Sequence, residues 1–141
     1  MTDNEIKWHS ESWMHKGKYF TVEIEHWQRK CIDDNDFDKE FIGNFWNVYA
    51  HIFPKHPIFE ELKNDELFLD HGITGYFHCG LSYHKWIADK NGEVEVKRLG
   101  SDYMHLHDNY KRVSDINQTP TMRDAKDLIE YLENYQRLNN D

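Results

Sequence analysis

The sequence has only two cysteines, Cys31 and Cys79, and no pair in the CxxC spacing. This scarcity excludes a disulfide framework and a cysteine-based structural zinc cluster, and free thiols are typical of a reducing cytosol. The N-terminal stretch MTDNEIKWHSESW lacks the apolar segment of a signal peptide. No apolar run approaches the ~20 residues that span a bilayer. We therefore expect a cytoplasmic protein that does not enter a membrane.

Basic residues are outnumbered, with 17 Lys and Arg against 26 Asp and Glu and a net charge of -9. Binding along a nucleic-acid backbone depends on basic side chains that neutralise phosphates, so long nucleic acids are excluded as partners. Two local basic pairs, Lys97-Arg98 and Lys111-Arg112, are expected to be solvated surface. The alternative is that one pair holds a small anion.

The glycine patterns of a P-loop and of a dinucleotide-binding fold are also missing. The acidic stretch DDNDFDKE, residues 33–40, lacks the central glycine and the correctly spaced closing glutamate of a calcium loop. An exposed loop is therefore expected there, and a divalent-ion loop is the disfavoured alternative.

The sequence is long enough, and rich enough in aromatic residues, to form one hydrophobic core. Its 141 residues fit a single domain, 1–141, and 15% of them are aromatic. Bulky rings bury much area per residue. The 30% of charged residues and the mean hydropathy of -0.93 indicate a well-solvated surface. These values predict a soluble globular protein.

Alternation of apolar and polar residues predicts strands. Residues 17–27 alternate with a period of two, residues 44–53 are almost all aromatic or β-branched, and residues 71–80 resemble a third strand. Residues 81–100 predict a hairpin, because Asn91-Gly92 supplies the positive φ of a tight turn. Residues 1–16 are expected to form an N-terminal extension, and the segment after Pro54 a loop or one helical turn.

The C-terminal part changes period. Apolar residues between Met122 and Tyr135 recur at i, i+3 and i+4, which predicts an amphipathic helix over residues 120–138. Thr119 is its expected N-cap with Pro120 at the first position, and Thr121 with Asp124 is an alternative capping pair. The expected fold is therefore α+β: four to five antiparallel strands, with the helix packed on one sheet face.

Acidic and histidine side chains are concentrated in GSDYMHLHDNY, residues 100–110. Asp102, His105 and Asp108 are spaced by three, so they converge only if the backbone turns after Gly100. Carboxylate with imidazole is a ligand set for Zn or Mn and also a general acid–base pair. The alternative is a polar turn in which His105 and His107 bind loop backbone.

Other histidines raise the same question. His71 precedes a glycine at an expected strand entrance, where its side chain can reach a pocket, whereas His78 is expected on a polar strand face. Cys79 follows His78 directly, and adjacent strand residues face apart, so a Cys–His dyad is not expected.

Four stretches in this order, KHPIF, HGITGYF, GSDYMHLHDNY and RDAKDLIEYLENY, resemble an uncharacterised family of small accessory proteins of tailed phages. That family carries patterns like GYVxVPxxHPLYG, HGGLTY and WWxGFDCAHAGD, followed by a helix. His56, Pro57, His71 and Gly72 stand at matching positions, and Asp102, His105 and Asp108 align with the third pattern. Ile73 and His107 stand where the family has glycine. The resemblance implies phage origin, action in the host bacterial cytoplasm and a polar site from two segments.

Three functions follow as hypotheses. The first is a phosphoester hydrolase acting on a small nucleotide in counter-defence. Its catalytic residues would be His71, Asp102, His105 and Asp108, and Zn or Mn would be held by His71, Asp102 and His105. The second is sequestration of a nucleotide signal, in which Lys111 and Arg112 bind phosphate and aromatic side chains stack on a base: Tyr76, Tyr83, Trp86, Tyr103 and Tyr110. The third is an inhibitor whose acidic face binds a basic host protein. A homo-oligomer stays open in each.

Overall fold

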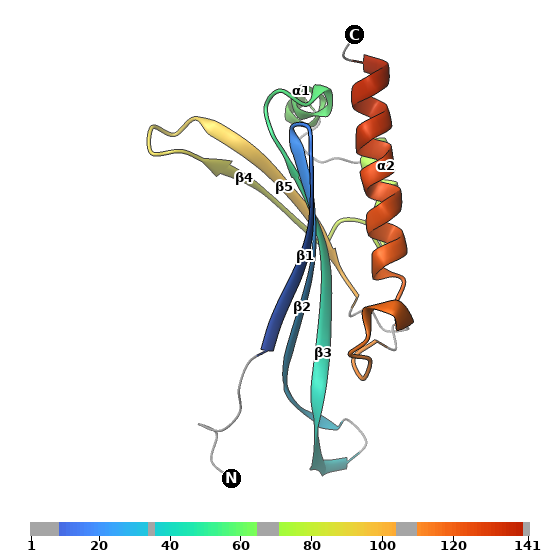
Figure 1. Ribbon diagram of the computed structural model, residues 1–141. Helices are drawn as coiled ribbons and strands as arrows, with labels where there is room; N and C mark the ends of the chain where they lie inside the picture. The colour runs from blue at the N-terminus through green and yellow to red at the C-terminus, as the bar shows by residue number, and fades with distance from the viewer. Residues whose placement is uncertain (1–8, 34–35, 65–70, 104–109, 140–141) are drawn as a thin grey trace.

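Figure 1 shows the computed structural model, in which α1 and α2 lie on one side of a five-stranded antiparallel sheet. The structure describes residues 9–33, 36–64, 71–103 and 110–139. The strand order is β1-β2-β3-β5-β4. The strands are β1 (His9–Gly17), β2 (Phe20–Asp33), β3 (Asp36–Ile52), β4 (Tyr83–Ala88) and β5 (Val94–Asp102). The helices are α1 (Pro57–Asn64), η2 (Gly72–Tyr76), η3 (Ile116–Gln118) and α2 (Thr121–Asn139).

The α+β prediction is confirmed. Within the described residues no helix is long and apolar enough to cross a membrane.

The core lies between the sheet and α2. Phe20 pairs with Ile52, and Ile24 with Val48, so alternate residues of β2 and β3 share one buried face. From α2, three buried residues meet this face: Ala125, Leu128 and Leu132. Their spacing is the helical period that the sequence predicted. α2 begins at Thr121, one residue later than the expected start at Pro120, and Thr119 Oγ1 accepts from the amide of Thr121.

The hairpin over residues 81–100 is confirmed by β4 and β5. The chain reverses between Asp89 and Glu93, where the Asp89 carboxylate accepts from the amides of Asn91 and Glu93. Gly92 has a φ of +83°, a conformation that glycine adopts without strain. The predicted strands at 17–27 and 44–53 correspond to parts of β2 and β3.

The strand expected at residues 71–80 is wrong. Residues 72–76 form the 3-10 helix η2, because the His71 ring caps its first amide and Thr74 Oγ1 donates to the His71 carbonyl. Cys79 and Gly80 then have φ values of +56° and +88°, which break any extended run. Local side-chain-to-backbone bonds therefore replace a sheet ladder here.

Two expected irregular segments also contain strands. The expected N-terminal extension 1–16 includes β1, whose Trp13 stacks on Trp46 with 6.2 Å between ring centroids. The expected loop at 33–40 is mostly the start of β3, where Lys30 forms an ion pair with Glu40 across the hairpin. Cross-strand partners distant in sequence stabilise both segments, and local composition does not show such partners.

His56 anchors α1 to α2. Its Nδ1 accepts from the amide of Ile58, and its Nε2 donates to the Leu132 carbonyl at 3.0 Å. Because Nδ1 is an acceptor, the ring is neutral with its proton on Nε2. Burial lowers the pKa of His56, since the charged imidazolium would lose hydration.

Substitution of Leu128 tests the core assignment. Leu128 is fully buried between α2 and the sheet, so Leu128→Ala is expected to lower the free energy of unfolding by about 2–5 kcal/mol. The exposed Lys126→Ala on the same helix should change it by no more than about 0.5 kcal/mol. Urea unfolding followed by tryptophan fluorescence measures both. A Leu128→Ala loss as small as that of Lys126→Ala would contradict this packing.

Acidification tests His56. Its pKa is lower folded than unfolded, so the unfolded chain binds more protons and stability falls as pH drops below ~6.5. His56→Gln removes this titration and should cost about 1–2 kcal/mol at neutral pH. We expect the acid-induced loss of unfolding free energy to be smaller in His56→Gln than in the wild type. His15→Gln, which replaces an exposed imidazole, is the control and should keep the wild-type loss.

Candidate functional site

A groove lies between η2 and the C-terminal half of α2. Two rows on α2 line one wall at i, i+4, i+8 spacing, and Tyr76 of η2 lines the other. The first row is Asp127, Tyr131 and Tyr135, and the second is Glu130, Asn134 and Leu138. The groove has a volume of about 550 Å³. We call these seven residues the tyrosine groove.

The tyrosine rings form a continuous wall. Tyr76 lies 4.4 Å from Tyr131, and Tyr131 lies 5.6 Å from Tyr135, measured between ring centroids. The Tyr135 hydroxyl donates to Glu61 of α1, which fixes the last ring against its neighbouring helix. The rings are therefore held by packing and by one hydrogen bond to a carboxylate.

The electrostatic environment of the groove is negative. Burial, together with Tyr76 and the Glu61 carboxylate, raises the pKa of Tyr131 to about 12. Burial and the bond to Glu61 also raise the pKa of Tyr135. Both hydroxyls therefore stay neutral near pH 7, and the formal charges at the groove are the carboxylates.

His71 lies beside the tyrosine groove, near Tyr135, and one of its ring nitrogens is hydrogen-bonded. Nδ1 accepts from the Ile73 amide at 3.1 Å, and Nε2 lies 3.8 Å from Glu61 Oε1. Since Nδ1 is an acceptor, the proton is on Nε2 and points towards Glu61. His71 thus caps η2 and supports Glu61. Its Nδ1 is therefore not available to a metal in this arrangement.

The structure does not bring His71 and Asp102 together. Asp102 ends β5 opposite Asn47, on the sheet face away from α2, whereas His71 lies on the helix side. No group of three or more His, Cys, Asp or Glu in the described part of the chain could hold a metal ion. His105, His107 and Asp108 lie outside the described residues, so their part of the prediction is untested.

The predicted ligand-binding residues are also dispersed. Trp86 faces the core at the α1 end, where it contacts Phe59 at 5.5 Å. Tyr110 packs on Tyr103, and the Lys111 carbonyl accepts from Asn44. Arg112 pairs with Asp33 at 3.1 Å and stacks on Phe41. Trp86 therefore lies at α1, whereas residues 111 and 112 contact β2 and β3.

Two further expectations are corrected. Lys97 was expected on the solvated surface, but it is fully buried, with Nζ 4.3 Å from the centre of the Trp86 ring and 3.2 Å from His84 Nδ1. Burial lowers the pKa of Lys97 to about 8. His78 does not lie on a strand, and its ring stacks on Tyr103 at 4.3 Å. Tertiary packing, not local pattern, places both.

Comparison with protein families, with curated proteins and with solved structures finds no match for this chain. The resemblance to the phage accessory family therefore stays a prediction.

Sequence reasoning missed the tyrosine groove. Its signal was present in the helix, since Tyr131 and Tyr135 follow Asp127 at steps of four. Tyr135 was assigned to the apolar stripe of the helix, because aromatic residues at helical spacing usually belong to the core. The groove could not be derived without Tyr76, which reaches α2 only through the unexpected 3-10 helix.

Substitution of His71 separates its structural role from the predicted metal site. His71→Asn retains an acceptor for the Ile73 amide, and asparagine is a good N-cap, so we expect its unfolding free energy to stay within about 0.5 kcal/mol of the wild type. His71→Ala should lose about 1 kcal/mol. If Zn or Mn raises the thermal unfolding temperature of the wild type but not that of His71→Asn, His71 is a metal ligand and this assignment is wrong.

Proposed function

We propose that this protein is a non-catalytic binding protein whose tyrosine groove captures a positively charged side chain of a partner protein. The observation that carries this proposal is the lining of the groove, which has three tyrosine rings and two carboxylates. No lysine or arginine occurs among its described lining residues. This is the third of the three functions that the sequence suggested, an acidic protein that binds a basic partner.

The chemistry of the groove selects for cations. The face of a tyrosine ring attracts a guanidinium or ammonium group, with a contribution of about 0.5–2 kcal/mol that grows with desolvation. Asp127 and Glu130 add Coulomb attraction at the rim. The same carboxylates repel phosphate, so this groove does not suit a nucleotide. The apolar stems of lysine and arginine pack against aromatic surfaces, which suits the tyrosine wall.

The volume of the groove also suits a side chain of a partner. About 550 Å³ falls within the range of sites that enclose most of a small ligand. Asn134 provides an amide that can bond to the backbone of the partner, and Leu138 offers apolar contact at the exposed end.

The whole-chain charge supports the same partner class. A net charge of -9 steers a basic surface towards the protein before contact is made. Such steering raises the association rate and weakens with salt. The resemblance to phage accessory proteins makes a basic host factor the expected target.

The hydrolase and nucleotide-sequestration hypotheses stay predictions. Hydrolysis by the predicted site needs His105 and Asp108, which lie outside the described residues. Among the described site residues, His71 uses Nδ1 to cap η2 and lies on the other side of the sheet from Asp102.

The test uses a fluorescent peptide with two arginines and a matched peptide in which citrulline replaces each arginine. Citrulline keeps the shape and loses the charge, so we expect at least about tenfold weaker binding for the citrulline peptide, equivalent to roughly 1.4 kcal/mol. Glu130→Gln should weaken binding of the arginine peptide about three- to tenfold. Fluorescence anisotropy at low and high salt measures these affinities.

Glu133→Gln is the matched control, because it removes one exposed charge from α2 outside the groove, where Glu133 contacts His15. It should leave the peptide affinity unchanged. Equal binding of the arginine and citrulline peptides would sink the proposal. So would an equal loss in Glu130→Gln and Glu133→Gln, since the attraction would then depend on total charge alone.

A further inference from the structure

The sheet has a second face that carries its own set of residues. α1 and α2 both lie on the face that buries Phe20, Ile52 and Leu99 (Figure 1). No helix of the described chain covers the opposite face. Side chains on that face do not pack in the core. A regular pattern among them therefore indicates a role other than core packing.

The strand register places one line of mostly basic residues across this face. Lys16 pairs with Thr21, Thr21 with His51, and His51 with Arg98, which pairs with Lys85 on the far edge. Directly paired residues of antiparallel strands point to the same face, and neighbouring strands lie about 4.8 Å apart. These five residues therefore form a line roughly 19 Å long, which we call the basic row.

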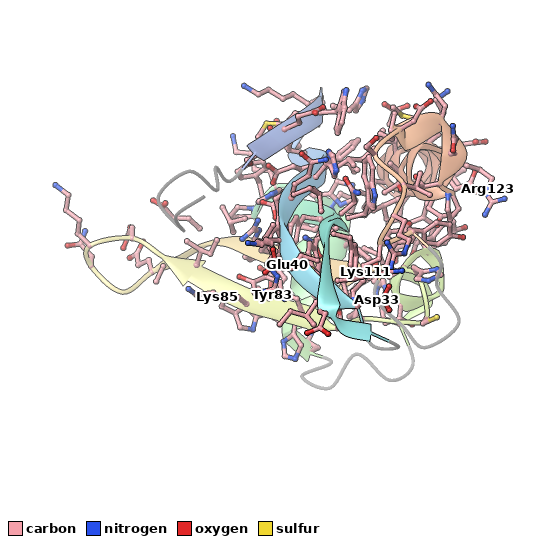
Figure 2. The ribbon with its side chains drawn as sticks, turned by 90° about the horizontal axis from the view of Figure 1, so that it is seen from below. Asp33, Glu40, Tyr83, Lys85, Lys111 and Arg123 are labelled. Atoms are coloured by element: carbon pink, nitrogen blue, oxygen red, sulfur yellow. The ribbon has the colours of Figure 1, made fainter. Side chains whose placement is uncertain are left out.

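The outer cations of the basic row are available. Lys16 and Lys85 are exposed, and neither makes an ion pair within the described residues. Figure 2 shows Lys85 beside Tyr83 on β4, well away from Arg123 on α2. The protein has a net charge of -9. Two unpaired lysines on one line with an arginine therefore form a local region of positive charge.

The central cation is held in position. The Arg98 guanidinium lies 3.9 Å from the centre of the Tyr49 ring and 5.3 Å from that of Tyr83. Glu23 lies 3.7 Å from Arg98 and 3.3 Å from His51 Nε2, and only 12% of its side chain is exposed. Glu23, on the next line of the same face, thus contacts both groups and neutralises one charge. Arg98 Nε is buried without a hydrogen-bond partner, so this network leaves a donor unused.

A tyrosine pair borders the row. Tyr49 and Tyr83 flank Gly100 on the next line of the same face, with 5.7 Å between their ring centroids. A Cβ at Gly100 would lie 2.5 Å from the Tyr49 ring, so glycine is what lets this ring cross β5. Aromatic rings beside a stacked guanidinium provide the flat surface on which a nucleobase stacks.

We infer that the basic row binds the phosphate groups of a ligand with several phosphates in a chain, of the nucleoside polyphosphate class. Arg98 and Lys85, which pair directly on adjacent strands, contact neighbouring phosphates, and the long Lys16 side chain reaches the other end of the phosphate chain from across Thr21 and His51. Tyr83, which borders the row and lies further from Arg98 than Tyr49 does, gives the base a place to stack. This site lies on the opposite face from the tyrosine groove and does not depend on it.

Charged residues on either side of the basic row favour an anionic ligand at one end of this face. The acids Glu25 and Asp102 lie two lines further along the strands, roughly 14 Å from the row. On the other side, Lys18 and Lys55 both approach the Tyr19 ring next to the β1–β2 turn. A ligand with one charge could engage only one of the separated cations of the row. A phosphate chain engages several.

The experiment compares three probes by isothermal titration calorimetry at low salt: inorganic tripolyphosphate, ATP and adenosine. We expect tripolyphosphate and ATP to bind and adenosine alone not to bind. Lys85→Gln and Lys16→Gln should each weaken binding about three- to tenfold, because each removes one charge-assisted contact. Lys126→Gln on α2 removes the same charge from the other face and should leave the affinity unchanged. Both substituted lysines are exposed and unpaired, so the variants should fold as the wild type does.

ATP binding more tightly than tripolyphosphate identifies a nucleotide ligand, whereas equal affinities identify the phosphate chain as the recognised group. The inference fails if neither phosphate probe binds, or if Lys126→Gln weakens binding as much as Lys85→Gln does. Glu130→Gln, in the tyrosine groove, should leave tripolyphosphate affinity unaltered. A failure of this site is therefore separable from a failure of the groove.

Discussion

Burial of the apolar stripe of α2 against β2 and β3 is the constraint on which the rest of the structure depends. Leu128 and Leu132 are fully buried only because alternate residues of the two strands present a matching apolar surface. This packing fixes which residues of every other strand point towards the helix, since paired residues share a face. It also sets the rotation of α2 about its axis, and thereby turns Tyr131 and Asp127 towards η2.

The same constraint divides the molecule into two chemically different surfaces. On the helix side, carboxylates and tyrosine rings gather where α1, η2 and α2 meet, and Glu61 links His71 to Tyr135. On the other side, the register aligns Lys16, Arg98 and Lys85 across the sheet. An acidic chain can therefore present a tyrosine-lined groove with carboxylates on one face and a row of basic residues on the other.

The elements that were predicted correctly are those whose signal is local. The hairpin at Asn91-Gly92 and the helix after Pro120 follow from turn chemistry and from helical period, and both are confirmed. The segment at 71–80 was mistaken for a strand, because its apolar residues could not reveal that the His71 ring caps a 3-10 helix. The Asp102–His71 pairing was proposed across a sheet that separates these residues, and no spacing along the chain reports on that separation.

The sequence by itself determined the fold class, the helix with its buried stripe and the absence of a disulfide framework, because these depend on composition and on periods of two and 3.6 residues. Only the tertiary structure decided which polar residues meet. Lys97 and Arg98 are adjacent in the chain, yet one is buried beside Trp86 and the other lies on the opposite face, stacked on Tyr49. Adjacent residues of a strand point apart, and residues far apart in sequence become neighbours through register and helix packing. Sites built from such neighbours have no local signature.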